Sequence, residues 1–196
     1  MHTELVSAVA IALTFALFVP YIRGILRGSL RPHVFSWVVW GIGTFVVFLA
    51  QLAGQGGAGA WPIGVSGIIT FYVALIAYLK RGDTRITRSD WAFLAAALSA
   101  FPVWVVTSNP LWAVVILTLA DLVGFGPTVT RVYRSPYQDS AVFFLLGAVR
   151  NGLVVLALER YSLTTALFPA AVGVACLLLS SMILWRRSMV EERVVG

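Results

Sequence analysis

The stretch LTTALFPAAVGVACLLLSSMILW, residues 163–185, contains no charged side chain and ends in a tryptophan. A helix that crosses a bilayer needs roughly 20 mostly apolar residues, and this stretch is long enough. The composition of the whole 196-residue chain is also strongly apolar, because 60% of all residues are hydrophobic and 11% are charged. Soluble domains are about 25% charged and have too little interior to bury such an apolar excess. We therefore predict an integral membrane protein whose apolar side chains face lipid.

Similar apolar runs recur along the chain and are separated by polar or glycine- and proline-rich breaks. The predicted spans are residues 5–24, 34–52, 61–79, 90–107, 110–133, 140–158 and 163–185. The connections between these spans are too short to fold into a soluble domain. The predicted fold class is an all-α membrane protein with seven transmembrane helices.

The basic residues gather at one set of helix ends. Of the 14 lysines and arginines, all except Arg150 and Arg160 lie at or beyond the end of the first, third, fifth or seventh span. Cytoplasmic connections are enriched in Lys and Arg, so we expect a multi-pass protein of the cell inner (plasma) membrane, with its N-terminus outside and its C-terminus cytoplasmic. This distribution explains the net charge of +6 without nucleic acid. Membrane lipid is the expected surrounding partner, and homo-oligomerisation is left open.

An internal repeat appears when the chain is shifted by 107 residues against itself. The shift aligns Pro20 with Pro127 and Pro62 with Pro169, and it needs no gap from the first span to the last. It also pairs Arg27 with Arg134, Val47 with Val154, Leu49 with Leu156, Ala50 with Ala157, Val65 with Val172 and Ile76 with Ile183. We interpret this as a duplication of a three-helix unit.

The duplication predicts how the chain is divided. Three spans reverse the direction of the chain, so the extra fourth span restores a common orientation for both copies. The predicted division is a first triple-helix bundle (5–80), a linker transmembrane helix (81–109), a second triple-helix bundle (110–187) and a cytoplasmic tail (188–196). Parallel repeats related by an axis along the membrane normal are a transporter architecture.

This three-one-three plan, with a proline near the cytoplasmic end of the first helix of each repeat, resembles the SWEET sugar transporters and the wider PQ-loop superfamily. That superfamily also includes PnuC-type vitamin transporters, lysosomal amino-acid exporters and the KDEL receptor. The segment WVVW, residues 37–40, is similar to the WxxW element of PnuC transporters. The proline–glutamine signature is absent, because Tyr21 follows Pro20 and Thr128 follows Pro127. The resemblance implies a substrate site between the two bundles and prolines that let helices bend.

Residue types argue against an enzyme. The only histidines are His2 and His33, near helix ends, and no Ser-His-Asp set, HExxH motif or phosphate loop is present. Hydrolysis or phosphoryl transfer needs such groups placed together. The single cysteine excludes a multi-cysteine metal site, and Lys80, the only lysine, lies in a loop where it cannot hold retinal. We predict no catalytic residue, no metal and no cofactor.

Two ionisable residues lie near the middle of predicted spans. Asp121 is in the fifth span and Arg150 in the sixth, and both lie roughly ten positions from the outer ends of antiparallel helices, so they share a depth. Charges inside a membrane are costly and are functional candidates by default. We predict an ion pair that either binds substrate or bridges the second bundle. A protonatable Asp121 would suit proton coupling, whereas an arginine partner would keep the carboxylate charged and disfavour it.

Polar and aromatic side chains supply the remaining substrate-binding candidates. Asn151 follows Arg150 and corresponds to Thr44 in the repeat, and both are mid-membrane hydrogen-bonding groups. Trp40 lies one turn before Thr44, and Trp37 lies three residues earlier. A flat indole beside an amide suits a sugar or nucleoside ring, and packing or lipid contact is the alternative.

Helix breakers supply hinge candidates. Gly124, Gly126 and Pro127 lie within four residues, and Pro20 is the corresponding proline of the first repeat. Proline removes a helical hydrogen bond and glycine permits bending. We expect the second bundle to deform more, since the segment before Pro20 lacks the glycines.

The function that we predict is transport of a small polar solute, such as a sugar, nucleoside, vitamin or amino acid, by alternating access between the two bundles. Two alternatives stay open. One is a membrane receptor or sorting protein with the same fold. The other is a non-transporting assembly subunit, which would lack a polar cavity between the bundles and would have oligomeric partners covering one face.

Overall fold

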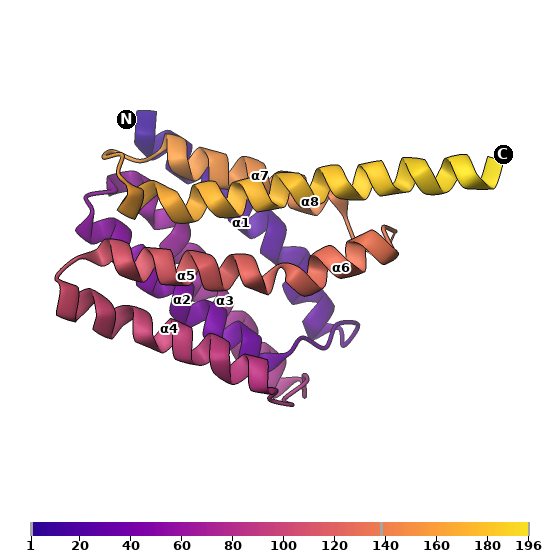
Figure 1. Ribbon diagram of the computed structural model, residues 1–196, viewed down its shortest axis with the longest axis horizontal. Coiled ribbons are helices and arrows are strands. Elements are labelled where there is room, and N and C mark those ends of the chain that lie inside the picture. The colour runs from indigo at the N-terminus through magenta and orange to yellow at the C-terminus, as the bar shows by residue number, and fades with distance from the viewer. Residues whose placement is uncertain (1, 138, 196) are drawn as a thin grey trace.

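The computed structural model describes residues 2–137 and 139–195, and this part of the chain is helical apart from its connections. The helices in chain order are α1 (His2–Leu26), α2 (Val34–Ala53), η1 (Gly57–Ala60), α3 (Trp61–Leu79), α4 (Arg88–Thr107), α5 (Pro110–Gly124), α6 (Gly126–Arg134), α7 (Ala141–Leu156) and α8 (Leu163–Val195). Figure 1 shows them running side by side, with α8 extending well beyond its neighbours at the C-terminal end.

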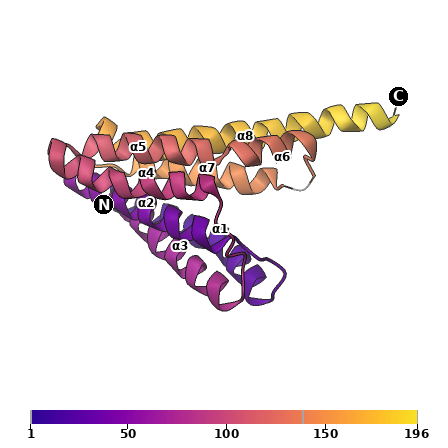
Figure 2. The ribbon, with the colours of Figure 1, turned by 60° about the horizontal axis from the view of Figure 1, so that its bottom comes forward.

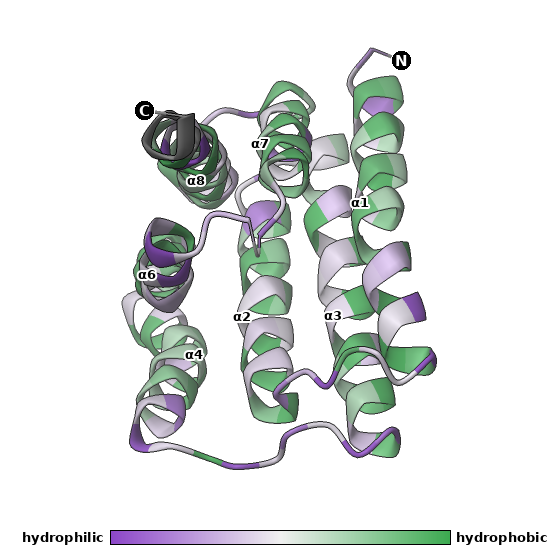
Figure 3. Ribbon diagram, turned by 90° about the vertical axis from the view of Figure 1, so that its right-hand side faces the viewer, coloured by the Kyte–Doolittle hydropathy of each residue, from purple (hydrophilic) through white to green (hydrophobic). Residues whose placement is uncertain are grey.

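Six helices of the described chain are long and apolar enough to cross a membrane, with α5 and α6 taken together as Pro110–Arg134, and α7 is a shorter apolar helix. Their outer faces carry large apolar side chains such as Val106 and Leu178. Figure 3 shows the same pattern, with hydrophobic helices and the hydrophilic residues gathered largely in the connections. Such a surface is stable only against lipid. The chain is therefore an all-α, multi-pass membrane protein.

Two of the predicted spans differ from the structure in extent. The span predicted over 110–133 is interrupted at Phe125, which separates α5 from α6. The interruption falls where Pro127 has no N–H to donate to the preceding turn. α8 continues through the predicted tail, 188–196, as far as Val195. By contrast, α1 continues through Pro20 without interruption.

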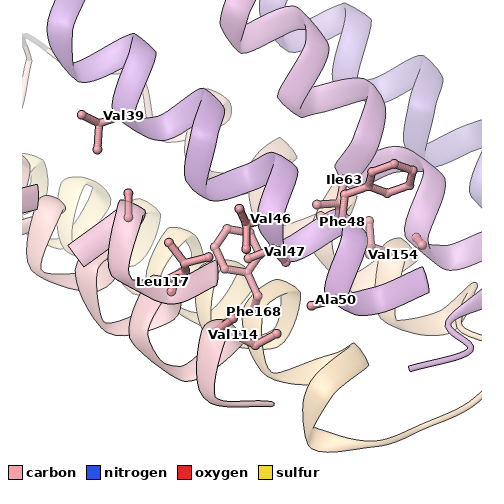
Figure 4. Close-up of a cluster of buried hydrophobic side chains, with 14 of the residues drawn as sticks. Val39, Val46, Val47, Phe48, Ala50, Ile63, Val114, Leu117, Val154 and Phe168 are labelled. Atoms are coloured by element: carbon pink, nitrogen blue, oxygen red, sulfur yellow. The ribbon is translucent and has the colours of Figure 1, made fainter. Parts of the chain in front are cut away.

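The helices form two groups, which we call the first group (α1–α3) and the second group (α5–α8). Within the first group, α3 packs against both α1 and α2, and within the second, α8 packs against both α5 and α7. The groups meet through α1 with α7 and through α2 with α5, while α4 packs on α5 and α2. A shared apolar core, which includes Val46, Val47, Leu117, Val154 and Phe168, fills the junction (Figure 4).

The two ends of the molecule differ. We call the end with connections 54–60, 108–109 and 157–162 the glycine-rich end, and the end with connections 27–33, 80–87 and 135–140 the basic end. Figure 2 shows the ribbons of α1–α3 close to the second group at the glycine-rich end and diverging from it toward the basic end. The close contacts between the groups therefore concentrate at one end.

Candidate functional site

Arg150 is buried in α7, with 7% of its surface exposed, and it connects the two helix groups. Its Nε donates to Thr14 Oγ1 of α1 at 3.0 Å, and one terminal nitrogen donates to the Pro62 carbonyl of α3 at 2.6 Å. The other terminal nitrogen donates to Asn151 Oδ1 at 3.2 Å. We call these four residues the Arg150 junction. All three acceptors are neutral, so the guanidinium is hydrogen-bonded without being neutralised.

The predicted ion pair between Asp121 and Arg150 is wrong. None of the ion pairs within the described residues joins them. The guanidinium points from α7 toward α1 and α3, whereas Asp121 belongs to α5. A shared depth in the membrane was therefore not enough to predict an ion pair, because the two side chains point in different directions.

Asp121 points into the protein. It continues the buried stripe of α5 formed by Val114, Leu117 and Thr118, whereas the exposed residues Leu119 and Val123 lie on the opposite face. The side chain is half-buried, and its carboxylate has no hydrogen bond or ion pair with any other described residue. An interior carboxylate without a partner is costly in a membrane protein, so it marks a candidate binding position.

The face of α5 that carries Asp121 is turned toward α2. One turn before Asp121, Leu117 contacts Gly43, where an added Cβ would lie 3.3 Å from the leucine side chain. One turn after it, a Cβ added to Gly124 would lie 3.9 Å from the Trp40 indole nitrogen. Residues three and four apart share a helix face. Asp121 thus lies between two points of close approach to α2.

Trp40 belongs to an aromatic cluster beside this face. Its ring meets Trp37 edge to face at 5.5 Å between centroids, and Trp37 in turn contacts Tyr21 at 5.1 Å and Phe18 at 6.2 Å. Trp40 is 42% exposed although it lies opposite α5. We call Asp121, Gly124, Trp37 and Trp40 the Asp121 site. It combines an unpaired carboxylate with an accessible aromatic surface.

The other two predicted binding residues point elsewhere. The Thr44 methyl group lies 3.6 Å from a Cβ added to Gly67, so Thr44 faces α3. The Asn151 amide donates to the Gly147 carbonyl at 2.9 Å, and its Cβ lies 3.2 Å from a Cβ added to Gly173 of α8. Both residues act within a helix group. The predicted set therefore divides between the Asp121 site, the Arg150 junction and helix packing.

Thr14 and Pro62 were not predicted as partners of Arg150. Pro62 was selected only as an aligned proline of the repeat. The available signal was indirect: a mid-membrane arginine needs several acceptors, and buried hydroxyls and the carbonyls near helix ends are the groups that supply them. The sequence does not say which helix supplies these acceptors.

The glycine-rich end is held together by hydrogen bonds between the connections of the two groups. The Glu159 N–H donates to the Gly56 carbonyl at 3.1 Å, and the Glu159 carboxylate accepts from the Ala58 N–H at 3.0 Å. Gln51 Nε2 donates to the Thr165 carbonyl at 2.7 Å. We call these contacts the glycine-end junction. They join the two groups at this end.

Glycine makes this approach possible. A Cβ on Gly59 would lie 2.7 Å from the Leu158 backbone nitrogen, which is closer than real Cβ atoms come. Gly57 has a φ of +59°, a conformation that glycine adopts at little cost. Any larger residue at position 59 would force the two connections apart.

A cavity of about 490 Å³ lies at the glycine-rich end, and neither Asp121 nor Arg150 is among its lining residues. It is lined by Glu4, Ser7, Ala8, Ile11, Leu52, Gly57, Ala58, Trp61 and Glu159. It is broadly open, and Trp61 on its wall is an exposed side chain at a helix end, where indoles anchor at membrane interfaces. We place the candidate site at Asp121 because an unpaired charge in the interior of a membrane protein costs free energy. An open surface depression carries no such cost.

Comparison with known proteins found no match: no family model matches the chain, and no curated protein or solved structure is significantly similar to it. The function must therefore be inferred from the residues and their geometry.

Proposed function

We propose that this protein is a transporter that moves a small polar solute by alternating access between two triple-helix bundles. The observation that carries the proposal is an asymmetry between the two ends, because hydrogen bonds join the groups at the glycine-rich end whereas the helices diverge toward the basic end. The two groups are joined at the glycine-rich end, diverge toward the basic end (Figure 2), and have Asp121 facing the space between α2 and α5. A solute site that opens at one end at a time needs these features.

The packing supports a repeated architecture like that of the PQ-loop and SWEET-like proteins. Under the shift of 107 residues, the first three spans correspond to the fifth, sixth and seventh. The central helix of the first group, α3, then corresponds to α8, the central helix of the second. The contact of α1 with α7 likewise corresponds to that of α5 with α2. In this proposal the two groups are parallel repeats and α4 is the inverting linker.

The distribution of charge supports an orientation in the cell inner membrane. Most of the arginines lie in the connections of the basic end or in the helix ends beside them, so the positive-inside rule places that end in the cytoplasm. The glycine-end junction then faces outside, and the structure corresponds to an inward-facing state. Opening to the outside requires the hydrogen bonds of this junction to break.

A disulfide across the glycine-end junction tests the mechanism. In a Cys176→Ser background, Gly54→Cys and Thr164→Cys would face each other, since a Cβ on Gly54 lies 3.3 Å from Thr164 Cγ2. Purified full-length protein is first screened by thermal shift against sugars, nucleosides, B vitamins and amino acids at two pH values. Ligands at 100 times their dissociation constant stabilise by about 2.7 kcal/mol. Uptake of the hits is then measured in proteoliposomes, where oxidation should stop uptake and a reductant should restore it.

The matched control is a disulfide within one group. Gly147→Cys faces the native Cys176, whose sulfur lies 3.3 Å from an added Cβ, and this bond joins α7 to α8. It should leave uptake unchanged. Uptake that persists through the oxidised glycine-end disulfide contradicts alternating access. If none of the four solute classes is bound or taken up, transport of these classes is the wrong function, and the receptor or assembly role gains support.

A further inference from the structure

The C-terminal part of α8 is fixed to the connection between α6 and α7. α8 continues as a helix beyond its apolar run, and α6 lies beside this part of it (Figure 1). Arg186 Nε donates to the Tyr133 carbonyl at 3.0 Å. Arg187 donates to the carbonyls of Pro136 at 3.1 Å and Asp139 at 2.8 Å. Two consecutive arginines therefore hold α8 against this connection.

Arg186 retains hydrogen-bond donors that the protein does not use. Its guanidinium carbon lies 4.4 Å from the centre of the Tyr133 ring, which is a cation–π contact. Only its Nε has an acceptor among the described residues. A guanidinium has five N–H donors, so those of both terminal nitrogens remain available. The ring and the carbonyl of Tyr133 thus fix the position of this charge without neutralising it.

Positive charge is in excess around this contact. Arg134, the last residue of α6, is exposed and makes no hydrogen bond or ion pair with the rest of the described chain. Arg131 is paired with Asp139 through two hydrogen bonds, at 2.8 and 3.0 Å. Residues 126–140 and 186–190 together carry four arginines and one aspartate, a net charge of +3. This surface therefore attracts an anion.

The excess charge lies where the apolar part of the chain ends. The apolar run of α8 ends at Trp185, directly before Arg186, and the span formed by α5 and α6 ends at Arg134. Trp185, Tyr133 and Tyr137 have exposed side chains. Exposed tryptophans and tyrosines are typical of the boundary between hydrocarbon and headgroups. The anions nearest to the two arginines at this level of a membrane are the phosphates of lipids.

We infer that Arg186, in contact with Tyr133, and the neighbouring Arg134 bind the headgroup of an anionic phospholipid. We call these three residues the Arg186 site. The planar fork of a guanidinium matches two oxygens of a phosphodiester, and the net positive charge favours an anionic lipid over a zwitterionic one. This inference does not depend on transport, because the site lies at the basic end, on the second group alone.

The experiment compares lipids that differ in headgroup charge. Full-length protein in dodecyl maltoside is mixed with dioleoyl phosphatidylglycerol or dioleoyl phosphatidylcholine at equal mole fractions, and bound lipid is measured by native mass spectrometry. We expect the first phosphatidylglycerol to bind about tenfold more tightly than phosphatidylcholine, which is the range that one or two arginines give at an anionic lipid surface. A further sample contains glycerol 3-phosphate in place of lipid, and we expect it to bind at least tenfold more weakly, about as the same phosphate does without its acyl chains.

Variants assign the preference to the site. Arg134→Gln combined with Arg186→Gln should reduce the preference to about twofold or less, and Arg186→Lys, which keeps the charge but removes the planar fork, should reduce it about two- to threefold. The matched control combines Arg85→Gln with Arg88→Gln. It removes the same charge from two exposed residues at the same end of the protein, and it should leave the preference unchanged.

A single variant keeps the test available if the double variant does not fold. Arg134→Gln changes an exposed residue without a hydrogen bond to the described chain, so it should leave thermal unfolding unchanged and lower the preference about threefold.

Each outcome decides for or against the site. A preference that is lost in the variants of Arg134 and Arg186 and kept in the control supports it. Equal binding of the two lipids to the unaltered protein overturns the inference. An equal loss in both double variants also overturns it, because the whole basic end would then attract anionic lipid without a defined site. Binding of glycerol 3-phosphate as tight as that of phosphatidylglycerol would assign the arginines to a soluble phosphate and overturn the lipid as ligand.

Discussion

The Arg150 junction and the Asp121 site handle an interior charge in opposite ways. Arg150 is almost fully buried and is held by three acceptors, two of which belong to the other helix group. Asp121 is half-buried and has no partner within the described chain. At the Arg150 junction, the hydrogen-bond donors of the charged group are used to join helices. At the Asp121 site, the hydrogen-bond acceptors of the carboxylate remain available, as a binding residue requires.

Their positions in the fold explain this difference. Pro62, which accepts from Arg150, is the second residue of α3 and lies near the glycine-rich end, where the groups are close enough for direct hydrogen bonds. Asp121 lies farther along α5, between two points where α5 and α2 approach through Gly43 and Gly124. The α2 residues at these points are a glycine and a tryptophan, and neither offers Asp121 a cationic partner.

The largest expected effect follows from removing the junction. Arg150→Ala leaves the Pro62 carbonyl without its donor and opens a cavity where the guanidinium lay, so the free energy of unfolding should fall by about 3 kcal/mol or more. Titration with SDS in mixed micelles measures it. Since Asp121 is not the partner of Arg150, adding Asp121→Asn should not recover the loss. Recovery in the double variant would show that the two charges compensate each other after all.

A smaller loss is expected from Thr14→Val, which keeps the shape of the side chain and removes the acceptor of Arg150 Nε. A buried charged donor left unpaired costs about 2–3 kcal/mol. Thr118→Val is the matched control, because Thr118 is equally buried but its hydroxyl donates only to the Val114 carbonyl of its own helix, at 2.7 Å. The same unfolding titration should find a loss below about 1 kcal/mol there. Equal losses in the two variants would mean that the hydrogen bond from Arg150 to Thr14 does not contribute to the free energy of unfolding.

The smallest effects come from two glycines and should have opposite signs. Gly59→Ala places a Cβ 2.7 Å from the Leu158 nitrogen and should destabilise the glycine-end junction by about 1–2 kcal/mol. Gly152→Ala meets nothing within 4 Å on an exposed face of α7 and should stabilise the helix by about 0.5–1 kcal/mol. Thermal unfolding followed by circular dichroism compares them. A neutral Gly59→Ala would imply that the two connections separate easily.

Several features of the fold followed from residue patterns. The positions of the helices were predicted by uninterrupted apolar runs, because a bilayer requires a length of apolar chain that is recognisable without neighbours. The break near Gly124 was visible as a cluster of residues that do not continue a helix. The direction of α6 and the helical continuation of α8 beyond the apolar run were not visible, since length and composition do not say how a helix continues outside the apolar region.

The site was predicted only in part. Trp37, Trp40 and Asp121 were selected by residue type and depth, and the structure brings them to facing helices. Thr44 and Asn151 were selected by the same reasoning but point toward α3 and α8. The depth of a residue is set by its place in the sequence, whereas the direction in which it points depends on how each helix is rotated against its neighbours.

The sequence by itself determined that this chain is a helical membrane protein, where its helices lie, and which few interior residues carry charge. These are properties of single segments in an apolar solvent. Only the tertiary structure decided that Arg150 bonds to Thr14 and Pro62 rather than to Asp121, and that Asp121 faces α2. The reason is that helix partners are chosen by packing between segments far apart in the chain, and a hydrogen bond depends on a few ångströms of that packing.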